Sequence, residues 1–134
     1  MRGGIEVRIL LDTAVLIFAV ETPERLSRRV ASALQNPENI LELSAISLAE
    51  IAIKTTLGKL GLTAAIARRA VEDLDIRILP FSAEHALHLF ELPLHLHHSD
   101  PFDRQIITQA LFEKIPVVTP DEKFSLYRGL KVIW

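Results

Sequence analysis

The sequence contains no cysteine. This absence excludes disulfide bonds, thiolate zinc sites and cysteine nucleophiles, and it fits a reducing cytoplasm. Long apolar runs are missing as well, since none approaches the roughly 20 residues that a helix needs to cross a bilayer. The first residues also lack the succession of basic, apolar and small residues that marks a signal peptide. We therefore expect a cytoplasmic protein with no membrane partner.

Repeats, low-complexity tracts and linkers are absent too, so residues 1–134 are expected to form a single domain. Hydrophobic residues make up 49% of the chain and the mean hydropathy is +0.28, which is high for a domain of this size. Because a small domain has much surface for its volume, we expect another chain to cover part of this apolar material, as in a homodimer. The net charge of -2 neither implies nor excludes a nucleic-acid partner.

Apolar runs of strand length alternate with segments of helical periodicity. The runs that predict strands are 6–11, 41–46, 76–79, 116–119 and 131–134. Helices are expected between them, at 13–20, 23–34, 47–57, 63–74, 82–92 and 101–114. This alternation predicts an α/β fold with three layers, in which a mostly parallel central sheet carries helices on both faces.

Acidic residues stand at the boundaries of these predicted elements. Asp12 follows the first strand and Asp121 follows the fourth, while Glu50 and Asp103 lie near the starts of two helices. Ligands of parallel sheets sit beyond the carboxyl ends of the strands. If the strands share one sheet, these four carboxylates converge at one edge of it.

Each acid alone also has a structural explanation. Ser47-Leu-Ala-Glu50 matches a capping box, in which the Glu50 side chain would satisfy a backbone donor. Asp100 precedes Pro101 and is expected to be the N-cap of the last helix. Asp103 then occupies the first turn, where the helix dipole favours an anion. Four independent caps, however, have no reason to face the same edge of a sheet.

Four short motifs, spread over nearly the whole chain, contain these acids. They are Leu10-Leu-Asp12-Thr13, Ser47-Leu-Ala-Glu50 followed by Gly58-Lys59-Leu60, His98-Ser-Asp-Pro-Phe-Asp103-Arg104, and Val118-Thr119-Pro-Asp121. In this order and spacing they resemble the PIN domain family, and specifically its branch of VapC-like toxins. The resemblance implies a PIN-like fold and an RNA-cleaving toxin of a type II toxin-antitoxin system. It also implies that the four acids bind Mg²⁺, for which Mn²⁺ can substitute.

The resemblance implies a protein partner as well. In the resembled toxins a VapB-like antitoxin covers a groove near the first helices and reaches the acidic site. Here the segment 14–20 is apolar nearly all round, which usually indicates a buried core helix. A cognate antitoxin would use the excess apolar surface, and an antitoxin arginine would neutralise the acids by bidentate pairing.

The chemistry of the four acids can also be argued without the family. Clustered carboxylates raise one another's pKa unless divalent cations neutralise them. Ligands that are all oxygen suit Mg²⁺ and Mn²⁺ rather than zinc. Two such ions activate a water and stabilise the leaving 3′ oxygen of a phosphodiester, which leaves a 5′ phosphate. We expect Asp12 and Asp103 to hold the principal metal, Glu50 and Asp121 to complete a second site or orient the water, and Asp100 to be accessory.

Polar neighbours of the acids are further candidates for the site. Thr13 and Thr119 are expected either to hydrogen-bond a ligand carboxylate or to be ordinary turn hydroxyls. Lys54 lies one helical turn after Glu50, so it either pairs with that acid or contacts a substrate phosphate. Arg104 is another candidate for a phosphate contact, although most lone surface cations have no such role.

Three histidines, His95, His97 and His98, precede the last predicted helix. In an irregular loop neighbouring side chains point apart, and no cysteine is available to complete a zinc site. We therefore expect loop histidines rather than a separate metal site, with His98 near the substrate.

Two phosphotransfer classes are excluded by single positions. A receiver-type domain needs a lysine at the end of its last strand, where this chain has Val132-Ile-Trp134. A haloacid dehalogenase-type phosphatase needs a second aspartate two residues after the first, where Asp12 is followed by Thr13-Ala-Val. The alternative that stays open is a non-catalytic PIN-like module that binds RNA or protein. The sequence does not identify the RNA target.

Overall fold

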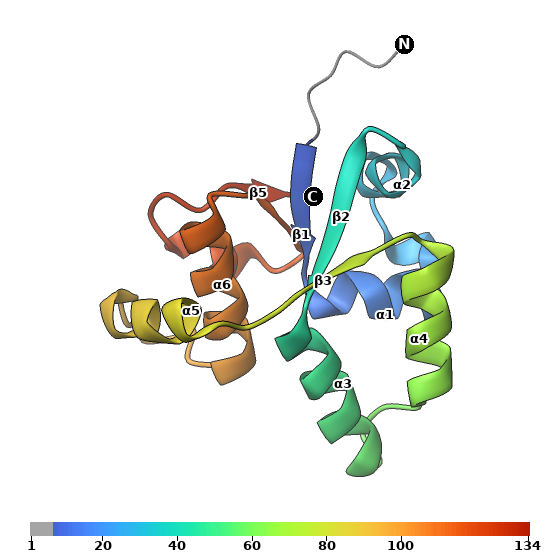
Figure 1. The fold of residues 1–134 in the computed structure, drawn as a ribbon, viewed down its shortest axis with the longest axis horizontal. Helices are drawn as coiled ribbons and strands as arrows, with labels where there is room; N and C mark the ends of the chain where they lie inside the picture. The colour runs from blue at the N-terminus through green and yellow to red at the C-terminus, as the bar shows by residue number, and fades with distance from the viewer. Residues whose placement is uncertain (1–6) are drawn as a thin grey trace.

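The computed structural model describes residues 7–134 (Figure 1). Within this range five strands form one sheet in the order β3-β2-β1-β4-β5, and every neighbouring pair is parallel. The strands are β1 (Val7–Leu11), β2 (Asn39–Ser44), β3 (Arg77–Leu79), β4 (Val117–Val118) and β5 (Val132–Ile133). The predicted parallel α/β sheet is confirmed, while Glu6, the expected first residue of β1, lies outside the described range.

Six α-helices and three short 3₁₀ helices connect the strands in the same described range. The α-helices are α1 (Thr13–Glu21), α2 (Arg28–Gln35), α3 (Ala45–Thr56), α4 (Ala64–Asp73), α5 (Ala83–His88) and α6 (Pro101–Glu113). The 3₁₀ helices are η1 (Pro23–Arg25), η2 (Leu89–Glu91) and η3 (Glu122–Leu126). None of the helices between residues 7 and 134 has both the length and the apolar character needed to span a bilayer.

The sheet separates two hydrophobic cores, which confirms the three-layer arrangement. Successive strand residues point to opposite faces, so Leu10 and Leu11 enter different cores. Leu10 packs in the core that contains Ile106 and Ile107 of α6. Leu11 packs in the core that contains Leu16 of α1. In Figure 1, α5 and α6 lie on one side of β1 and β2, and α1, α2 and α4 lie on the other.

Two of the predicted helices are shorter than expected. The segment 23–34 is divided into η1 and α2, because Ser27 has extended backbone and its hydroxyl accepts a hydrogen bond from the amide of Val30 as the N-cap of α2. The segment 82–92 continues past α5 only as η2. Its N-terminal end is fixed by Ser82 and His85, whose side chains each accept a hydrogen bond from the other residue's backbone amide.

The predicted capping box at Ser47 is wrong, because α3 begins two residues earlier. Ser44 is the N-cap, and its hydroxyl accepts a hydrogen bond from the amide of Ile46. Ser47 lies buried within the first turn and accepts a hydrogen bond from the hydroxyl of Thr13 at 2.8 Å. The Glu50 side chain therefore has no capping role and is free to face the end of the sheet.

The start of α6 agrees with the sequence. Asp100 is the N-cap, and its Oδ1 accepts hydrogen bonds from the amides of Phe102 and Asp103. Pro101 occupies the first helical position, where a missing N–H costs nothing. The helix ends at Glu113, and its C-cap Lys114 has left-handed backbone with φ of 58°. Asp103 is thereby held in the first turn with its side chain available for another role.

A network of buried and partly buried charged groups lies between the sheet and α6. Arg8 of β1 donates hydrogen bonds to both carboxylate oxygens of Glu42 on β2, and its Nη2 also donates to Glu113 of α6 at 3.0 Å. The His85 Nε2 lies 3.0 Å from the other oxygen of Glu113. The hydrogen bond from His85 and the pairing with Arg8 hold the pKa of Glu113 below its ordinary value, against the opposing effect of burial. This network ties α5 and α6 to the centre of the sheet.

Candidate metal centre

Four carboxylates meet beyond the carboxyl ends of β1 and β4. Asp12 follows β1, Asp121 follows β4 after a short turn, Glu50 projects from α3 and Asp103 from α6. All four line one cavity of about 310 Å³, together with Asp100. The structure thus brings together the acids that the sequence places in separate elements, at the edge where ligands of parallel sheets are found.

Asp12 is the most deeply enclosed of the acids that carry a shifted pKa. It is 5% exposed, its Oδ1 accepts a hydrogen bond from the amide of Thr13, and its Oδ2 accepts one from the hydroxyl of Thr119, each at 2.8 Å. Burial raises the pKa of Asp12 to about 7, and the charges of Asp103 and Glu50 add to the effect, whereas the two hydrogen bonds oppose it. The carboxylate is oriented by its neighbours but destabilised as an anion.

Asp103 has a similar electrostatic environment. Burial raises its pKa to about 7, followed by repulsion from Asp100, Glu50 and Asp121. The cation of Lys54 opposes this rise. A raised pKa at two neighbouring acids means that the protein alone does not supply enough positive charge to balance the cluster.

The two carboxylate oxygens of Glu50 have different surroundings. Its Oε2 accepts a hydrogen bond from Nζ of Lys54 at 2.7 Å, and this contact raises the pKa of Lys54. Its Oε1 is buried and, among the described residues, has no hydrogen-bond partner. Buried carboxylate oxygens are rarely left unpaired, because desolvation without a compensating bond is costly. A buried oxygen that is not hydrogen-bonded to the described residues, beside other carboxylates, is a suitable ligand for a cation.

The donor set fits a hard divalent ion. Oxygen atoms dominate it, as Mg²⁺ and Mn²⁺ require. Asp103 and Asp121 offer carboxylate oxygens within 4.8 Å of each other, and a ring nitrogen of His98 lies within the same distance of both. Together with the raised carboxylate pKa values and the unpaired oxygen of Glu50, this spacing indicates that the cavity is able to hold a divalent metal.

Of the polar neighbours predicted from the sequence, some have side chains that contact the acids and others do not. Thr119 contacts Asp12 directly, whereas the hydroxyl of Thr13 donates to Ser47 and only its backbone amide reaches Asp12. Lys54 pairs with Glu50 and lines the acidic cavity. Arg104 has its guanidinium engaged elsewhere, since it donates hydrogen bonds to the carbonyls of two loop residues, Leu92 and Pro93, and to the hydroxyl of Tyr127.

The sequence predicts His98 only as a loop histidine near the substrate, whereas in the structure it contacts Asp103. It is 4% exposed, and its Nε2 lies 3.2 Å from Oδ2 of Asp103. Its Nδ1 lies 2.7 Å from the hydroxyl of Tyr127. The contact depends on the path of the loop before α6, where His95 and His98 form an isolated antiparallel bridge. No periodicity in the sequence signals that path.

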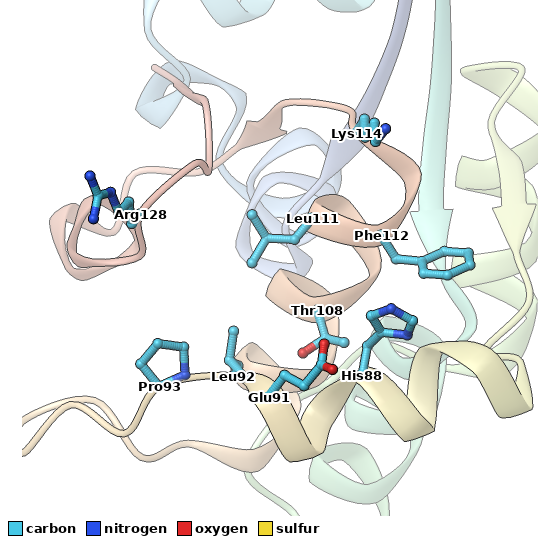
Figure 2. Close-up of a pocket in the computed structure, with 9 residues that line it drawn as sticks. All are labelled: His88, Glu91, Leu92, Pro93, Thr108, Leu111, Phe112, Lys114 and Arg128. Carbon is cyan, nitrogen blue, oxygen red and sulfur yellow. The ribbon is translucent and has the colours of Figure 1, made fainter.

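A second and larger cavity, of about 490 Å³, lies between α6 and the segment 88–93 (Figure 2). Its lining residues are His88, Glu91, Leu92, Pro93, Thr108, Leu111, Phe112, Lys114 and Arg128. Figure 2 shows one carboxylate, Glu91, and one imidazole, His88, in a lining that otherwise carries cationic, apolar and hydroxyl groups. A single acid beside two cations is a poor ligand set for Mg²⁺, so the smaller cavity is the better candidate for a metal centre.

Solved structures with the same fold include several toxin-antitoxin complexes. VapBC2 from Rickettsia felis, bound to a DNA fragment from its promoter, has a TM-score of 0.68 and 21% identity, and the match covers 95% of this chain and 98% of that chain. VapBC-5 from Mycobacterium tuberculosis has a TM-score of 0.61 and 20% identity, with coverage of 95% and 98%. The PIN domain endonuclease Utp24 has a TM-score of 0.52 and 19% identity, with coverage of 88% and 74%.

Comparison with models of protein families identifies the family of this chain. Among curated proteins no sequence matches this chain significantly. The family model described as PIN domain matches residues 9–130, which is most of the chain and includes Asp12, Glu50, Asp103 and Asp121. The fold, the topology and this match agree, and the chain belongs to the PIN domain family.

Proposed function

We propose that this chain is a metal-dependent ribonuclease that acts as the toxin of a type II, VapBC-like toxin-antitoxin module. The observation that carries the proposal is the convergence of Asp12, Glu50, Asp103 and Asp121 in one cavity. Clustered carboxylates at the end of a parallel sheet are suited to hold the divalent ions of phosphodiester hydrolysis. Membership of the PIN family and the shared fold of VapBC complexes and of the Utp24 endonuclease support the same function.

Neighbouring residues orient the carboxylates of the proposed site. Asp12 and Asp103 are the principal ligands in this proposal, and Glu50 and Asp121 complete the site. The hydroxyl of Thr119 fixes Oδ2 of Asp12, and Lys54 holds one oxygen of Glu50 while the other stays available. When bound, Mg²⁺ or Mn²⁺ supplies Lewis-acid chemistry, which activates water toward a phosphodiester and stabilises the charge on the leaving 3′ oxygen. RNA fragments with 5′ phosphates are the expected products.

The proposal includes a VapB-like antitoxin. A cleft of about 410 Å³ lies between α3 and α4, with Leu48, Ile51, Ala67 and Val71 in a largely apolar lining. Such a groove is suited to an apolar helix of a partner. An antitoxin that binds there would lie beside α3, the helix that carries Glu50. In this proposal toxin and antitoxin lie in the cytoplasm, and the bound antitoxin suppresses RNA cleavage.

A homodimer is also part of the proposal. Phe90, Leu94 and Leu96 are 88%, 85% and 92% exposed, and they stand close together in the sequence before α6. Large apolar side chains exposed in one segment are typical of a surface that another chain covers. Size-exclusion chromatography coupled to light scattering should give twice the mass of one chain.

The ribonuclease assignment is tested with the purified chain and RNA. Cleavage should require Mg²⁺ or Mn²⁺, stop with EDTA and resume when the metal is restored. Asp12→Asn should reduce the cleavage rate by about 1,000-fold or more, because it removes a principal ligand of a metal worth several kcal/mol of transition-state stabilisation. Full activity of a folded D12N variant, or RNA binding without cleavage by the wild-type chain, would contradict the assignment.

A further inference from the structure

A series of hydrogen-bonded side chains leads from Asp103 into the protein. The His98 imidazole lies between the carboxylate of Asp103, 3.2 Å from Nε2, and the hydroxyl of Tyr127, 2.7 Å from Nδ1. Arg104 then donates a hydrogen bond from Nη1 to the same hydroxyl at 3.3 Å. His98 and Tyr127 are 4% and 2% exposed, so water does not compete freely for these contacts. The positions of the protons in this series are therefore decided by the hydrogen bonds between its members.

The contacts determine which imidazole nitrogen carries a proton. Arg104 has only donors, so the Tyr127 oxygen accepts from it. The Tyr127 proton then lies toward Nδ1 of His98 at 2.7 Å or toward the His98 carbonyl at 3.4 Å. In the first case Nδ1 accepts, and the neutral imidazole carries its proton on Nε2. In the second case Nδ1 must donate to the Tyr127 oxygen, and a neutral imidazole would point a bare Nε2 lone pair at the Asp103 carboxylate.

The second neutral arrangement is unfavourable, because two acceptors would face each other in a buried position. The arrangement that satisfies both ring nitrogens therefore has Nε2–H donating to Oδ2 of Asp103. The His98 ring is fixed at its other nitrogen by Tyr127, in the way that neighbouring groups fix the ligands of metal centres.

We propose that His98 is a positioning residue of the metal centre, which holds Oδ2 of Asp103 through Nε2–H and is itself oriented by Tyr127 and Arg104. This inference rests on the proposed function, because Asp103 is a metal ligand only if that function is correct. It assigns Arg104 a role inside the protein: its guanidinium joins Tyr127 to the carbonyls of Leu92 and Pro93. One oxygen of Asp103 is held by His98, and the other is left for the metal.

The test compares Mn²⁺ affinity of the full chain by titration calorimetry for wild type and variants. His98→Leu should weaken Mn²⁺ binding by about 10- to 100-fold, as the loss of a group that orients a ligand typically does. His98→Gln should recover most of the affinity, because its amide N–H reaches the position of Nε2–H. Tyr127→Phe keeps the ring and loses the hydroxyl, so it should weaken binding by less than His98→Leu. His97→Leu, at an exposed neighbouring position, is the matched control and should bind as the wild type does.

Nitrogen-15 NMR of the histidine rings gives a second measurement, because it reports which ring nitrogen of His98 carries a proton. A purely structural role for His98 would not require that proton to be on Nε2. In the metal-free wild type, His98 should show a proton on Nε2, and that proton should persist when Mg²⁺ is added. Loss of the Nε2 proton on Mg²⁺ binding would mean that His98 is a metal ligand instead, and it would overturn the proposal. Wild-type Mn²⁺ binding with an equal affinity in His98→Leu would also overturn it. Absence of Mn²⁺ binding by the wild type would overturn the proposed function and this inference with it.

Discussion

The hydroxyl of Thr119 donates a hydrogen bond of 2.8 Å to Oδ2 of Asp12, and it joins residues that stand 107 positions apart in the chain. The contact is possible because β4 pairs with β1 in parallel register, with Leu11 opposite Val118. The next residues of both strands then lie side by side. Thr119 is buried, and its hydrogen bond lowers the pKa of Asp12 against the effect of burial.

Thr119→Val should weaken metal binding near neutral pH. Loss of the hydroxyl removes an interaction that favours the Asp12 anion, so the pKa of Asp12 should rise further above 7. At pH 7 a larger share of Asp12 would be protonated, and Mn²⁺ affinity should fall by about tenfold. Thr119→Ser keeps the hydroxyl and should retain the wild-type affinity in the same titration. Equal affinities for the two variants would show that the hydrogen bond has no role in binding.

Metal-free stability should fall as the pH rises. Burial holds the pKa of Asp12 and Asp103 at about 7, above the ordinary value of 3.8. A carboxyl group with a raised pKa in the folded state gives stability that is fully present below 3.8 and is lost as the pH rises through 7. The melting temperature in EDTA should therefore decline between pH 5.5 and pH 8, and Mn²⁺ should reverse the decline at pH 8.

Asp12→Asn provides the matched variant for that experiment. It removes the charge of the more buried acid and keeps a similar shape, so at pH 8 in EDTA it should be more stable than the wild type by about 2 kcal/mol. Denaturant unfolding at pH 5.5 and pH 8 measures this difference. A wild-type protein whose metal-free stability increases from pH 5.5 to pH 8 would contradict the electrostatic description of the cavity.

Arg8→Ala should destabilise the fold without weakening the metal centre. Its loss leaves Glu42, a residue 5% exposed, without its charge partner inside the protein. Removal of one member of a buried pair is costly, and since Arg8 itself is partly exposed we expect a loss of about 2 to 3 kcal/mol in the free energy of unfolding.

Arg8→Lys tests the geometry of the same pair. Lysine keeps the charge but cannot make two parallel hydrogen bonds to one carboxylate, so its stability in denaturant should lie between those of the wild type and Arg8→Ala. Mn²⁺ affinity should be unchanged in both variants, because Arg8 does not line the acidic cavity. Wild-type stability of Arg8→Ala would mean that the network contributes nothing to the fold.

The cleft between α3 and α4 gives a prediction about the antitoxin. Ala52→Arg places a charged side chain at the apolar lining of the cleft. It should prevent copurification with the proposed antitoxin, which we expect to be the product of an adjacent small open reading frame. RNA cleavage by the variant alone should be unchanged, because Ala52 does not line the acidic cavity. Ala86→Arg, on the exposed surface of α5, is the control and should still copurify. Antitoxin binding that survives Ala52→Arg would place the partner on another surface.

The strands and the convergence of the four acids could be predicted from the sequence, because both follow from local patterns of apolar and acidic residues. Runs such as residues 9–11 are apolar and are buried on both faces of the sheet. Parallel strands then force residues at their ends, Asp12 and Asp121, to one edge. The start of α3 was predicted wrongly, since Ser44 and Ser47 both precede apolar periodicity and only the backbone distinguishes the cap.

The remaining contacts depend on information that no local pattern contains. Arg8 reaches Glu42 because the register sets Leu10 opposite Glu42, which makes the two charged residues diagonal neighbours on one face. His98 reaches Asp103 because the loop before α6 folds back on itself. Register and loop path are decided by packing of the whole domain, so these contacts become visible only in the structure.

The most direct test of the central claim is the rate of RNA cleavage as a function of Mn²⁺ concentration, for the purified wild type and for Asp103→Asn. If the four carboxylates form a metal-dependent nuclease site, the wild-type rate will be zero without metal and will saturate with Mn²⁺. The variant rate will stay lower by about 1,000-fold or more at every concentration. A wild-type rate that is independent of Mn²⁺, or a folded Asp103→Asn that matches the wild type, would contradict the account.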